Sequence, residues 1–208
     1  MRDAIEGTYA LRPFPWPHLL IDGFLPPDTL SQCLGEISND VYDFEFEARG
    51  TGRIEFSLLK SKTLWRAIYS KDTIVTLRHA FGAGVKLNKH NMIQLRRMNQ
   101  KTPDFPLHND FTSGEDTVAS FLYLSPGWFA GCGGYFHMFE SNEHKNPALS
   151  IEPIQNRFLA FRTKSSHWHS VERVRDWERL SALALWDIEE GCGEERVAQN
   201  ESPTVPPG

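Results

Sequence analysis

Short runs of alternating apolar and polar residues, separated by Gly, Pro, Asn and Asp, extend along the chain from Asn91 to Ile188. Because side chains on a strand alternate between its two faces, this period of two indicates strands with one face in a core. Eight short strands at this spacing favour a two-sheet jelly roll, so the fold is predicted to be mainly β. The predicted strands cover residues 91–98, 105–111, 117–124, 134–139, 150–153, 157–162, 168–174 and 179–188.

The first 90 residues are predicted to support this core, mainly with helices. A strand is expected over residues 18–22, and the Pro26-Pro27-Asp28 segment that follows is typical of a helix start. The apolar residues after it recur with a helical period. A second helix is predicted over residues 71–85, whereas residues 40–62 are mixed, with acidic and glycine-rich pieces and weak strands.

Residues 1–190 are therefore predicted to form one domain, with a helical N-terminal part over 1–90 and the jelly-roll core over 91–190. A chain of 208 residues has the length of one domain with a substantial core. Residues 191–208 are polar, contain several prolines and show no period, so they are expected to form a flexible tail.

Composition narrows the possible partners. The net charge of -5 argues against a nucleic-acid-binding protein, which would need a basic patch. No apolar run is long enough for a membrane span, and the N-terminus does not resemble a signal peptide. The widely spaced Cys33, Cys132 and Cys192 form neither a metal motif nor an even disulfide set. A reducing cytoplasm is the expected location. The composition does not indicate which oligomeric state the protein adopts.

The segment His108-Asn109-Asp110 lies on a predicted strand, where residues two apart point to the same side. One imidazole and one carboxylate are thereby predicted to bind one metal ion. A second histidine would complete the set of two histidines and one carboxylate that non-haem Fe(II) oxygenases use. His167 and His169 are both candidates, and because they share one face, alternation does not decide between them.

Zinc is the main alternative metal, since catalytic zinc also uses three protein ligands and a water. Arg179, ten residues after His169, favours iron. An oxidative iron site needs an electron-donating cosubstrate such as 2-oxoglutarate, whose far carboxylate requires a buried cation. The planar guanidinium of Arg179 suits bidentate pairing, and Ser181 on the same strand face could add a hydroxyl donor.

Several segments, in their order and mutual spacing, resemble the Fe(II)/2-oxoglutarate-dependent dioxygenases of the prolyl-4-hydroxylase-like group. The resemblance covers residues 91–189, with an N-terminal echo in residues 15–25. It implies N-terminal helices and a cupin-like double-stranded β-helix core. The matching segments are His108-Asn109-Asp110 and residues 121–128, 133–139, 151–153, 156–161, 169–174 and 179–181.

The resemblance also implies roles for individual residues. His108, Asp110 and His169 would bind Fe(II), and Arg179 would form a salt bridge with the 5-carboxylate of 2-oxoglutarate. Tyr123 would donate its phenol hydroxyl to the same carboxylate. Fe(II), 2-oxoglutarate and O2 are then the expected cofactors, with ascorbate as the reductant. The presence of Asp110 favours hydroxylation over halogenation, because halogenating relatives lack this carboxylate.

Two departures from the family pattern bear on the substrate. The family often has a tyrosine ten residues before the motif histidine, and this chain has Met98 there. Gln94, Arg96 and Met98 share one strand face, which we expect to line the pocket because the opposite face carries two aliphatic residues. Arg96 is then a candidate for binding a substrate carboxylate. Asp116 stands where relatives often have arginine and could meet a substrate amine, or it could be an exposed loop residue.

The sequence therefore predicts an oxygenase that hydroxylates an unactivated C–H bond of a small molecule, with release of succinate and CO2. An amino acid or a natural-product intermediate would fit this description, and the compact chain favours such a substrate. A peptidyl, prolyl-type hydroxylase acting on a protein is one alternative. A non-catalytic cupin-like binding module is another, although the complete set of metal ligands argues against it.

Overall fold

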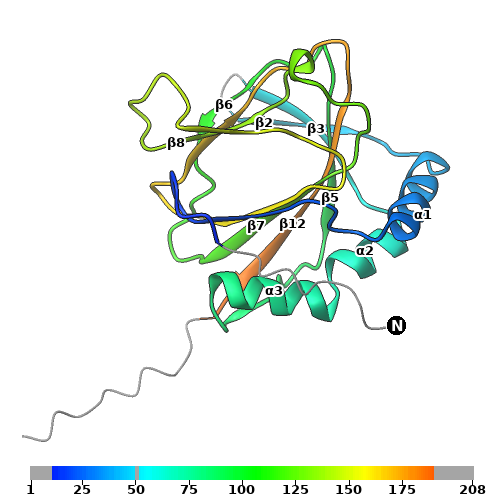
Figure 1. Ribbon diagram of the computed structural model, residues 1–208, viewed down its shortest axis with the longest axis horizontal. Helices are drawn as coiled ribbons and strands as arrows, with labels where there is room; N and C mark the ends of the chain where they lie inside the picture. Colours follow the sequence, from blue (N-terminus) through cyan, green and yellow to red (C-terminus); the bar gives the residue numbers. More distant parts are fainter. Residues whose placement is uncertain (1–10, 50–51, 190–208) are drawn as a thin grey trace, which may run out of the picture.

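Two antiparallel sheets face each other in the computed structural model, which describes residues 11–49 and 52–189 (Figure 1). The larger sheet consists, in order, of β1 (His18–Ile21), β10 (Phe158–Arg162), β7 (Thr117–Tyr123), β12 (Arg179–Ile188), β5 (Ile93–Met98), β3 (Gly52–Leu58) and β2 (Glu45–Arg49), with β4 (Val85–Leu87) pairing with β12. The smaller sheet consists of β6 (Phe105–His108), β11 (Trp168–Val171), β8 (Phe136–Phe139) and β9 (Leu149–Ile151).

The predicted fold, mainly β with N-terminal helices and a double-stranded β-helix core, is confirmed. Every strand expected from Asn91 onward is present, and β12 has the predicted ends. Most of the strands are shorter than predicted. The largest differences are in β11, which ends at Val171 instead of Val174, and in β6, which ends at His108 instead of continuing to Phe111. Its pairing with β11 ends at the His169–His108 pair, and the side-chain amide of Asn109 then donates to the carbonyl of Ser165 at 3.1 Å.

The helices follow the predictions in part. The predicted first helix is present as α1 (Pro27–Ser38). The second, α3 (Lys71–Phe81), ends four residues earlier than predicted, because Gly82 has a φ of 112° that a continuing helix cannot adopt. Residues without a clear sequence pattern form the β2–β3 hairpin and the start of α2 (Lys62–Ile68), and a short 3-10 helix, η1 (Ala130–Cys132), follows β7.

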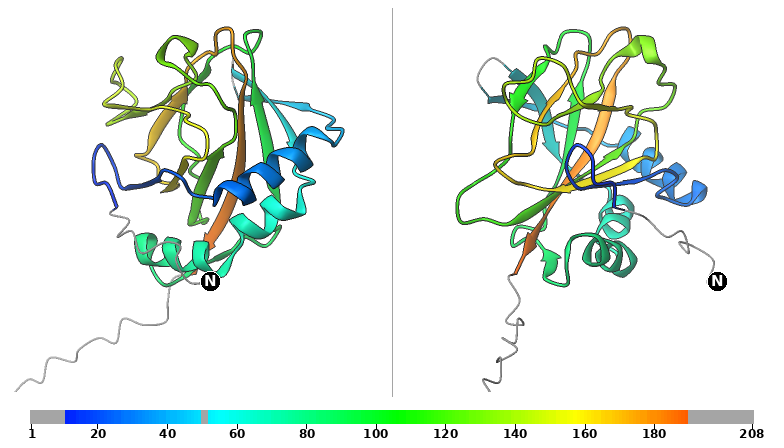
Figure 2. Two further views of the ribbon diagram at one scale, coloured as in Figure 1. Left: turned by 45° about the vertical axis from the view of Figure 1, so that its right-hand side comes forward. Right: turned by 60° about the vertical axis from the view of Figure 1, so that its left-hand side comes forward.

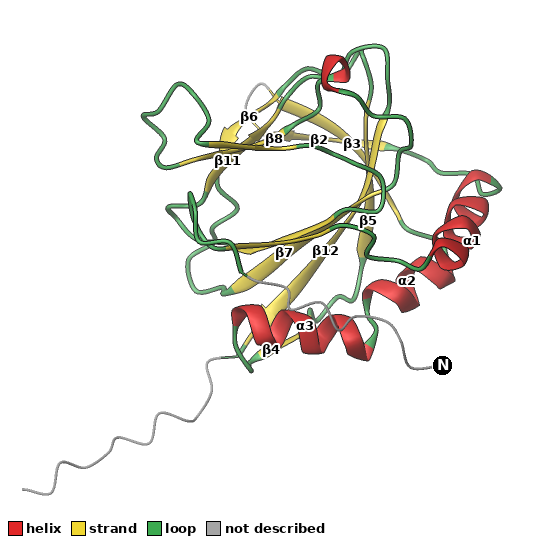
Figure 3. Cartoon of the chain, in the orientation of Figure 1, coloured by secondary structure: helices red, strands yellow, loops and turns green. Residues whose placement is uncertain are grey.

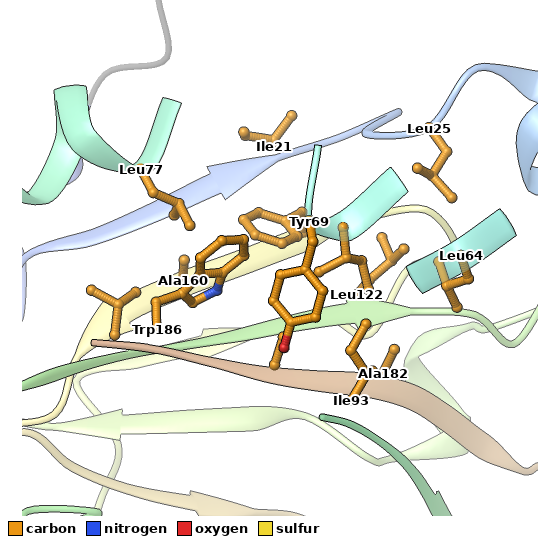
Figure 4. Close-up of a cluster of buried hydrophobic side chains, with 14 of the residues drawn as sticks. Ile21, Leu25, Leu64, Tyr69, Leu77, Ile93, Leu122, Ala160, Ala182 and Trp186 are labelled. Carbon is orange, nitrogen blue, oxygen red and sulfur yellow. The ribbon is translucent and has the colours of Figure 1, made fainter. Parts of the chain in front are cut away.

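The three α-helices lie against the outer face of the larger sheet (Figures 2 and 3). Strands β7 and β12 direct alternate side chains toward them. Figure 4 shows this outer core, in which Ala182 and Trp186 of β12 lie against Leu64, Tyr69 and Leu77 of the helical region. Burying each large apolar side chain contributes about 1.5–3 kcal/mol, so this layer holds the sheet against the helices.

The inner face of the larger sheet packs against the smaller sheet. Phe121 and Leu183 point inward from β7 and β12 and join Phe136 and Met138 of β8 in a second apolar cluster. The few polar side chains on these inner faces are therefore surrounded by apolar residues, and they form the candidate site.

Gly133 and Gly134 allow the chain before β8 to approach the segment before β12. Both have positive φ angles, 66° and 76°. A Cβ atom on Gly133 would lie 2.3 Å from the carbonyl oxygen of Arg173, so only glycine fits there. The backbone N–H of Gly134 donates to the same carbonyl at 3.2 Å.

No helix in the described part of the chain is long and apolar enough to cross a membrane. The predicted tail, residues 191–208, lies outside the described residues, as does residue 190 at the end of the predicted domain.

Candidate metal centre

The pairing of β6 with β11 brings two histidines together. His108 is the last residue of β6, and its direct partner in β11 is His169. Asp110 follows two residues after His108. The ligand atoms of these three side chains all lie within 4.8 Å of one another. Asp110 approaches the Nε2 atoms of His169 and His108 at 3.3 Å and 3.6 Å. Two imidazoles and one carboxylate at this spacing can hold one metal ion and leave other coordination positions open.

Hydrogen bonds to the backbone orient both imidazoles. The Nδ1 atom of His108 lies 2.7 Å from the carbonyl oxygen of Pro106, and Nδ1 of His169 lies 2.9 Å from the carbonyl oxygen of His167. Because a carbonyl only accepts, each Nδ1 carries the proton. Each Nε2 then has its lone pair directed at the position between the three ligands, as metal binding requires.

His167, the other histidine considered from the sequence, lies apart from this group. Its Nδ1 donates to the carbonyl oxygen of Arg162 at 2.6 Å, and its ring stacks on the indole of Trp16. Burial lowers the pKa of His167, so the ring is neutral at physiological pH. The structure thus brings His169 to His108 and Asp110, while His167 fills a position in the wall behind them.

A second polar group lies on the inner face of β7 and β12, where Ser181 pairs with Tyr123. The side chains of Tyr123, Arg179 and Ser181 are fully or almost fully buried. The guanidinium of Arg179 lies 5.0 Å from the centroid of the Tyr123 ring, and its Nη1 donates to Ser181 Oγ at 3.4 Å. Burial raises the pKa of Tyr123, so its phenol keeps the proton and acts as a donor.

Several donors of this group have no partner among the described residues. They are Nε and Nη2 of Arg179 and the hydroxyl of Tyr123, all buried. A buried guanidinium without an anion is unfavourable, so this arrangement fits a ligand carboxylate that would accept from both side chains. A dicarboxylate such as 2-oxoglutarate offers a carboxylate of this kind.

A cavity of about 480 Å³ opens beside the metal ligands, with Asp110 in its wall. Arg96 also lines the cavity. Gln94 orients Arg96 by accepting hydrogen bonds from Nε at 3.0 Å and Nη2 at 2.8 Å. Met98 is fully buried in the inner core and is not part of the cavity wall. Of the three residues predicted to line the pocket, Arg96 is the one that contacts the cavity.

Asp116 also lines the cavity, but its carboxylate is already engaged. It pairs with the guanidinium of Arg162 and with Lys164, whose Nζ lies 3.3 Å away. Asp116 lies in the loop before β7, as one interpretation expected, but only 19% of its side chain is exposed, because the ion pairs hold it against the end of β10. A substrate amine would have to compete with these two cations.

Lys89 and His90 at the cavity mouth were not anticipated from the sequence. They lie between α3 and β5 in a segment without periodicity, and only the pairing of β4 with β12 places that segment beside the cavity. A cluster of cationic residues shortly before the first core strand was the signal available.

Comparison with known proteins supports the fold. Residues 93–186 match the 2OG-Fe(II) oxygenase superfamily, a region that contains the three candidate metal ligands as well as Tyr123 and Arg179. The match covers a little under half of the 208-residue chain, and over this region the chain resembles the 2OG-Fe(II) oxygenase superfamily. Its members are enzymes, and the prolyl-4-hydroxylase-like group expected from the sequence includes several of the most similar structures.

Solved structures show the same fold. A prolyl-4-hydroxylase from Pseudomonas putida superimposes with a TM-score of 0.63 at 19% identity, covering 84% of this chain and 93% of that one. A prolyl hydroxylase from Trichoplax adhaerens, in complex with a hypoxia inducible factor peptide, gives 0.62 at 18% identity, covering 83% and 84%. HygX from Streptomyces hygroscopicus, with nickel and 2-oxoglutarate bound, gives 0.58 at 11% identity, covering 83% of each chain. No curated protein sequence matches the chain significantly.

Proposed function

We propose that this chain is an Fe(II)- and 2-oxoglutarate-dependent hydroxylase of a small molecule, releasing succinate and CO2. One observation carries the proposal. Buried donors of Arg179 and Tyr123 have no partner among the described residues and lie in the same domain interior as a group of two histidines and one carboxylate. A zinc hydrolase would require the metal ligands but not the buried cation. A binding module would require neither.

In this proposal His108, Asp110 and His169 hold Fe(II), while Arg179, Tyr123 and Ser181 bind the far carboxylate of 2-oxoglutarate. Bound iron and 2-oxoglutarate supply the oxidising power for C–H hydroxylation, with O2 as the oxidant. The protein contributes position and exclusion of water. The apolar inner core, with Phe121 and Leu183, surrounds the polar groups and strengthens their electrostatic interactions.

The cavity beside Asp110 supports a small substrate. Its volume of about 480 Å³ is within the range of small-molecule sites, about 300–1,000 Å³. Arg96 at its wall would bind a substrate carboxylate or a similar anion, with Gln94 holding the guanidinium in place. Asp116 would position Arg162 and Lys164 rather than bind a substrate amine directly. Met98, on the same face of β5 as Gln94 and Arg96, would contribute only apolar packing in the inner core.

The proposal is tested by measuring succinate release against a panel of metals and substrates. The purified protein is incubated with Fe(II), ascorbate, 2-oxoglutarate and O2, together with amino acids, natural-product carboxylates and proline-containing peptides. Coupled succinate release with a small molecule, absent with Zn(II), is the expected result. Activity with zinc and no keto acid would contradict the oxygenase proposal, whereas coupling to a peptide alone would contradict the small-molecule substrate.

The variant His108→Ala should lose succinate release, because a metal ligand is removed. The matched control is His144→Ala, whose side chain is 54% exposed and lies on the loop after β8. This control should keep the activity of the unaltered protein.

A further inference from the structure

Trp16 lies outside the region that matches the oxygenase family, yet its side chain is buried against the candidate metal centre. It precedes β1, the N-terminal edge strand of the larger sheet, and only 5% of its surface is exposed. Its indole Nε1–H donates to the carbonyl oxygen of Phe139 at 3.1 Å. Because Phe139 is the last residue of β8, this bond ties the N-terminal segment to the smaller sheet, which carries both metal-ligand histidines.

The indole face of Trp16 is stacked on His167. The ring centroids are 4.6 Å apart and the planes differ by 11°. The imidazole of His167 is also held by the hydrogen bond from its Nδ1 to the carbonyl oxygen of Arg162. Its backbone N–H in turn donates to the carbonyl of Lys164 at 3.0 Å. His167 is therefore fixed by Trp16 and by the turn that leads into β11.

The carbonyl oxygen of His167 is the acceptor for Nδ1 of His169, at 2.9 Å. This bond decides which nitrogen of His169 carries the proton, and so whether Nε2 is available to a metal. Phe136 and Phe161 also pack on the His169 ring, at 5.0 Å and 5.2 Å between centroids, and the Trp16 ring meets it edge-on at 6.4 Å. These ring contacts restrict the ring plane but do not hold the acceptor. Trp16 also contacts the residue that provides it.

We propose that Trp16 is a positioning residue for the metal ligand His169 and acts through His167. Trp16 holds His167 in place, so that the carbonyl of His167 stays directed at Nδ1 of His169. The Nε2 atom of His169 then stays directed at Asp110. Groups that orient a metal-binding histidine through its second nitrogen typically change metal affinity about 10- to 100-fold when they are altered. The inference rests on the proposed function in one respect, namely that His169 binds the metal.

The test compares Trp16→Leu with Trp128→Leu in the full chain. Trp128 is the matched control, because its Nε1 also donates to a backbone carbonyl, that of Gly133 at 2.9 Å, and its ring contacts Tyr135 rather than a metal ligand. Fe(II) affinity is measured anaerobically by chelator competition. Trp16→Leu should weaken Fe(II) binding about 10- to 100-fold, while Trp128→Leu should change it less than about 2-fold. Equal losses in the two variants would overturn the proposal.

A second readout is independent of metal binding. In the metal-free protein, ¹⁵N NMR of the histidine rings reports whether Nδ1 of His169 carries a proton. Nδ1 should be protonated in the unaltered protein and in Trp16→Phe, which keeps a ring for stacking, whereas in Trp16→Leu the proton should shift toward Nε2, which faces the Asp110 carboxylate at 3.3 Å. An unchanged tautomer in Trp16→Leu would refute the role of Trp16.

Fe(II) affinity and the tautomer of His169, measured together, distinguish a failure of this proposal from a failure of the proposed function. If His169→Ala binds Fe(II) as tightly as the unaltered protein, the metal site is wrong. A tautomer change in Trp16→Leu would then still support the link from Trp16 to His169. If Trp16→Leu does not fold, Trp16→Phe remains informative, because it removes the bond to Phe139 but keeps the stack. A Trp16→Phe protein with the tautomer lost would contradict a role based on stacking.

Discussion

Replacing Arg179 with methionine should abolish tight 2-oxoglutarate binding. Two of its buried donors, Nε and Nη2, have no partner among the described residues. In the complex each would donate to a carboxylate. A hydrogen bond that involves a charged group contributes about 1.5–3 kcal/mol, so two contribute about 3–6 kcal/mol. Since 1.4 kcal/mol corresponds to about a factor of ten, Arg179→Met should weaken 2-oxoglutarate binding roughly 100- to 10,000-fold.

The same substitution should have the opposite effect on the ligand-free protein. A buried guanidinium without an anion lowers stability, and methionine fills a similar volume without a charge. Without 2-oxoglutarate, Arg179→Met should therefore unfold at the same temperature as the unaltered protein or at a higher one. This combination of lost ligand binding and retained stability distinguishes a ligand-binding arginine from one that only supports the fold.

Calorimetric titration of the metal-loaded protein with 2-oxoglutarate gives the affinity, and thermal unfolding gives the stability. Arg175→Met is the control, because Arg175 lies on the surface with a side chain that is 59% exposed and pairs with Glu172. A 2-oxoglutarate affinity of Arg179→Met within threefold of the unaltered protein would refute the assignment of this carboxylate site.

Three further predictions follow from individual side chains. Tyr123→Phe should weaken 2-oxoglutarate binding by roughly 3- to 10-fold in the same titration, the effect of one neutral hydrogen bond, and an unchanged affinity would remove Tyr123 from the site. Arg96→Ala should raise KM for the substrate without changing 2-oxoglutarate affinity. The control Arg97→Ala, on the opposite strand face and paired with Glu55, should change neither quantity. Loss of 2-oxoglutarate binding in Arg96→Ala would instead make Arg96 a residue that binds the cosubstrate. Threonine and serine hydroxyls lower the pKa of Glu36 to about 2, so its ionised form stabilises the fold above the ordinary value of 4.5 and this contribution is lost as the pH falls toward 2. Glu36→Gln should therefore be less stable than the unaltered protein at pH 6 and equally stable near pH 2, as measured by urea unfolding, and a constant difference would contradict the role of ionisation.

The sequence predicted the core strands because burial on one face leaves a period of two, which is visible without a structure. It was less informative where elements are short. In α2 only Leu64 and Ile68 are buried, one turn apart, and two positions do not establish a helical period. The end of β6 was misplaced for a related reason. Alternation continues through Asp110, but pairing with β11 stops at His108 and hydrogen bonds of Asn109 turn the chain away.

The candidate site was partly predictable from spacing. His108 and Asp110 are two residues apart, so their proximity is local. Their approach to His169 depends on the register of β11 against β6, which no local pattern contains. The resemblance to a family supplied this partner. The positions of Trp16 and Lys89 depend on contacts between segments far apart in the sequence, and for this reason neither was anticipated as part of the site.

The central claim is that one site in this protein holds Fe(II) together with 2-oxoglutarate. Anaerobic titration of the Fe(II)-loaded protein with 2-oxoglutarate tests it directly, because chelation of ferrous iron by a keto acid produces a visible charge-transfer band. The account predicts a saturable band with Fe(II) that is absent with Zn(II) and lost in His108→Ala. A protein that binds Fe(II) but gives no band and no 2-oxoglutarate binding would contradict it.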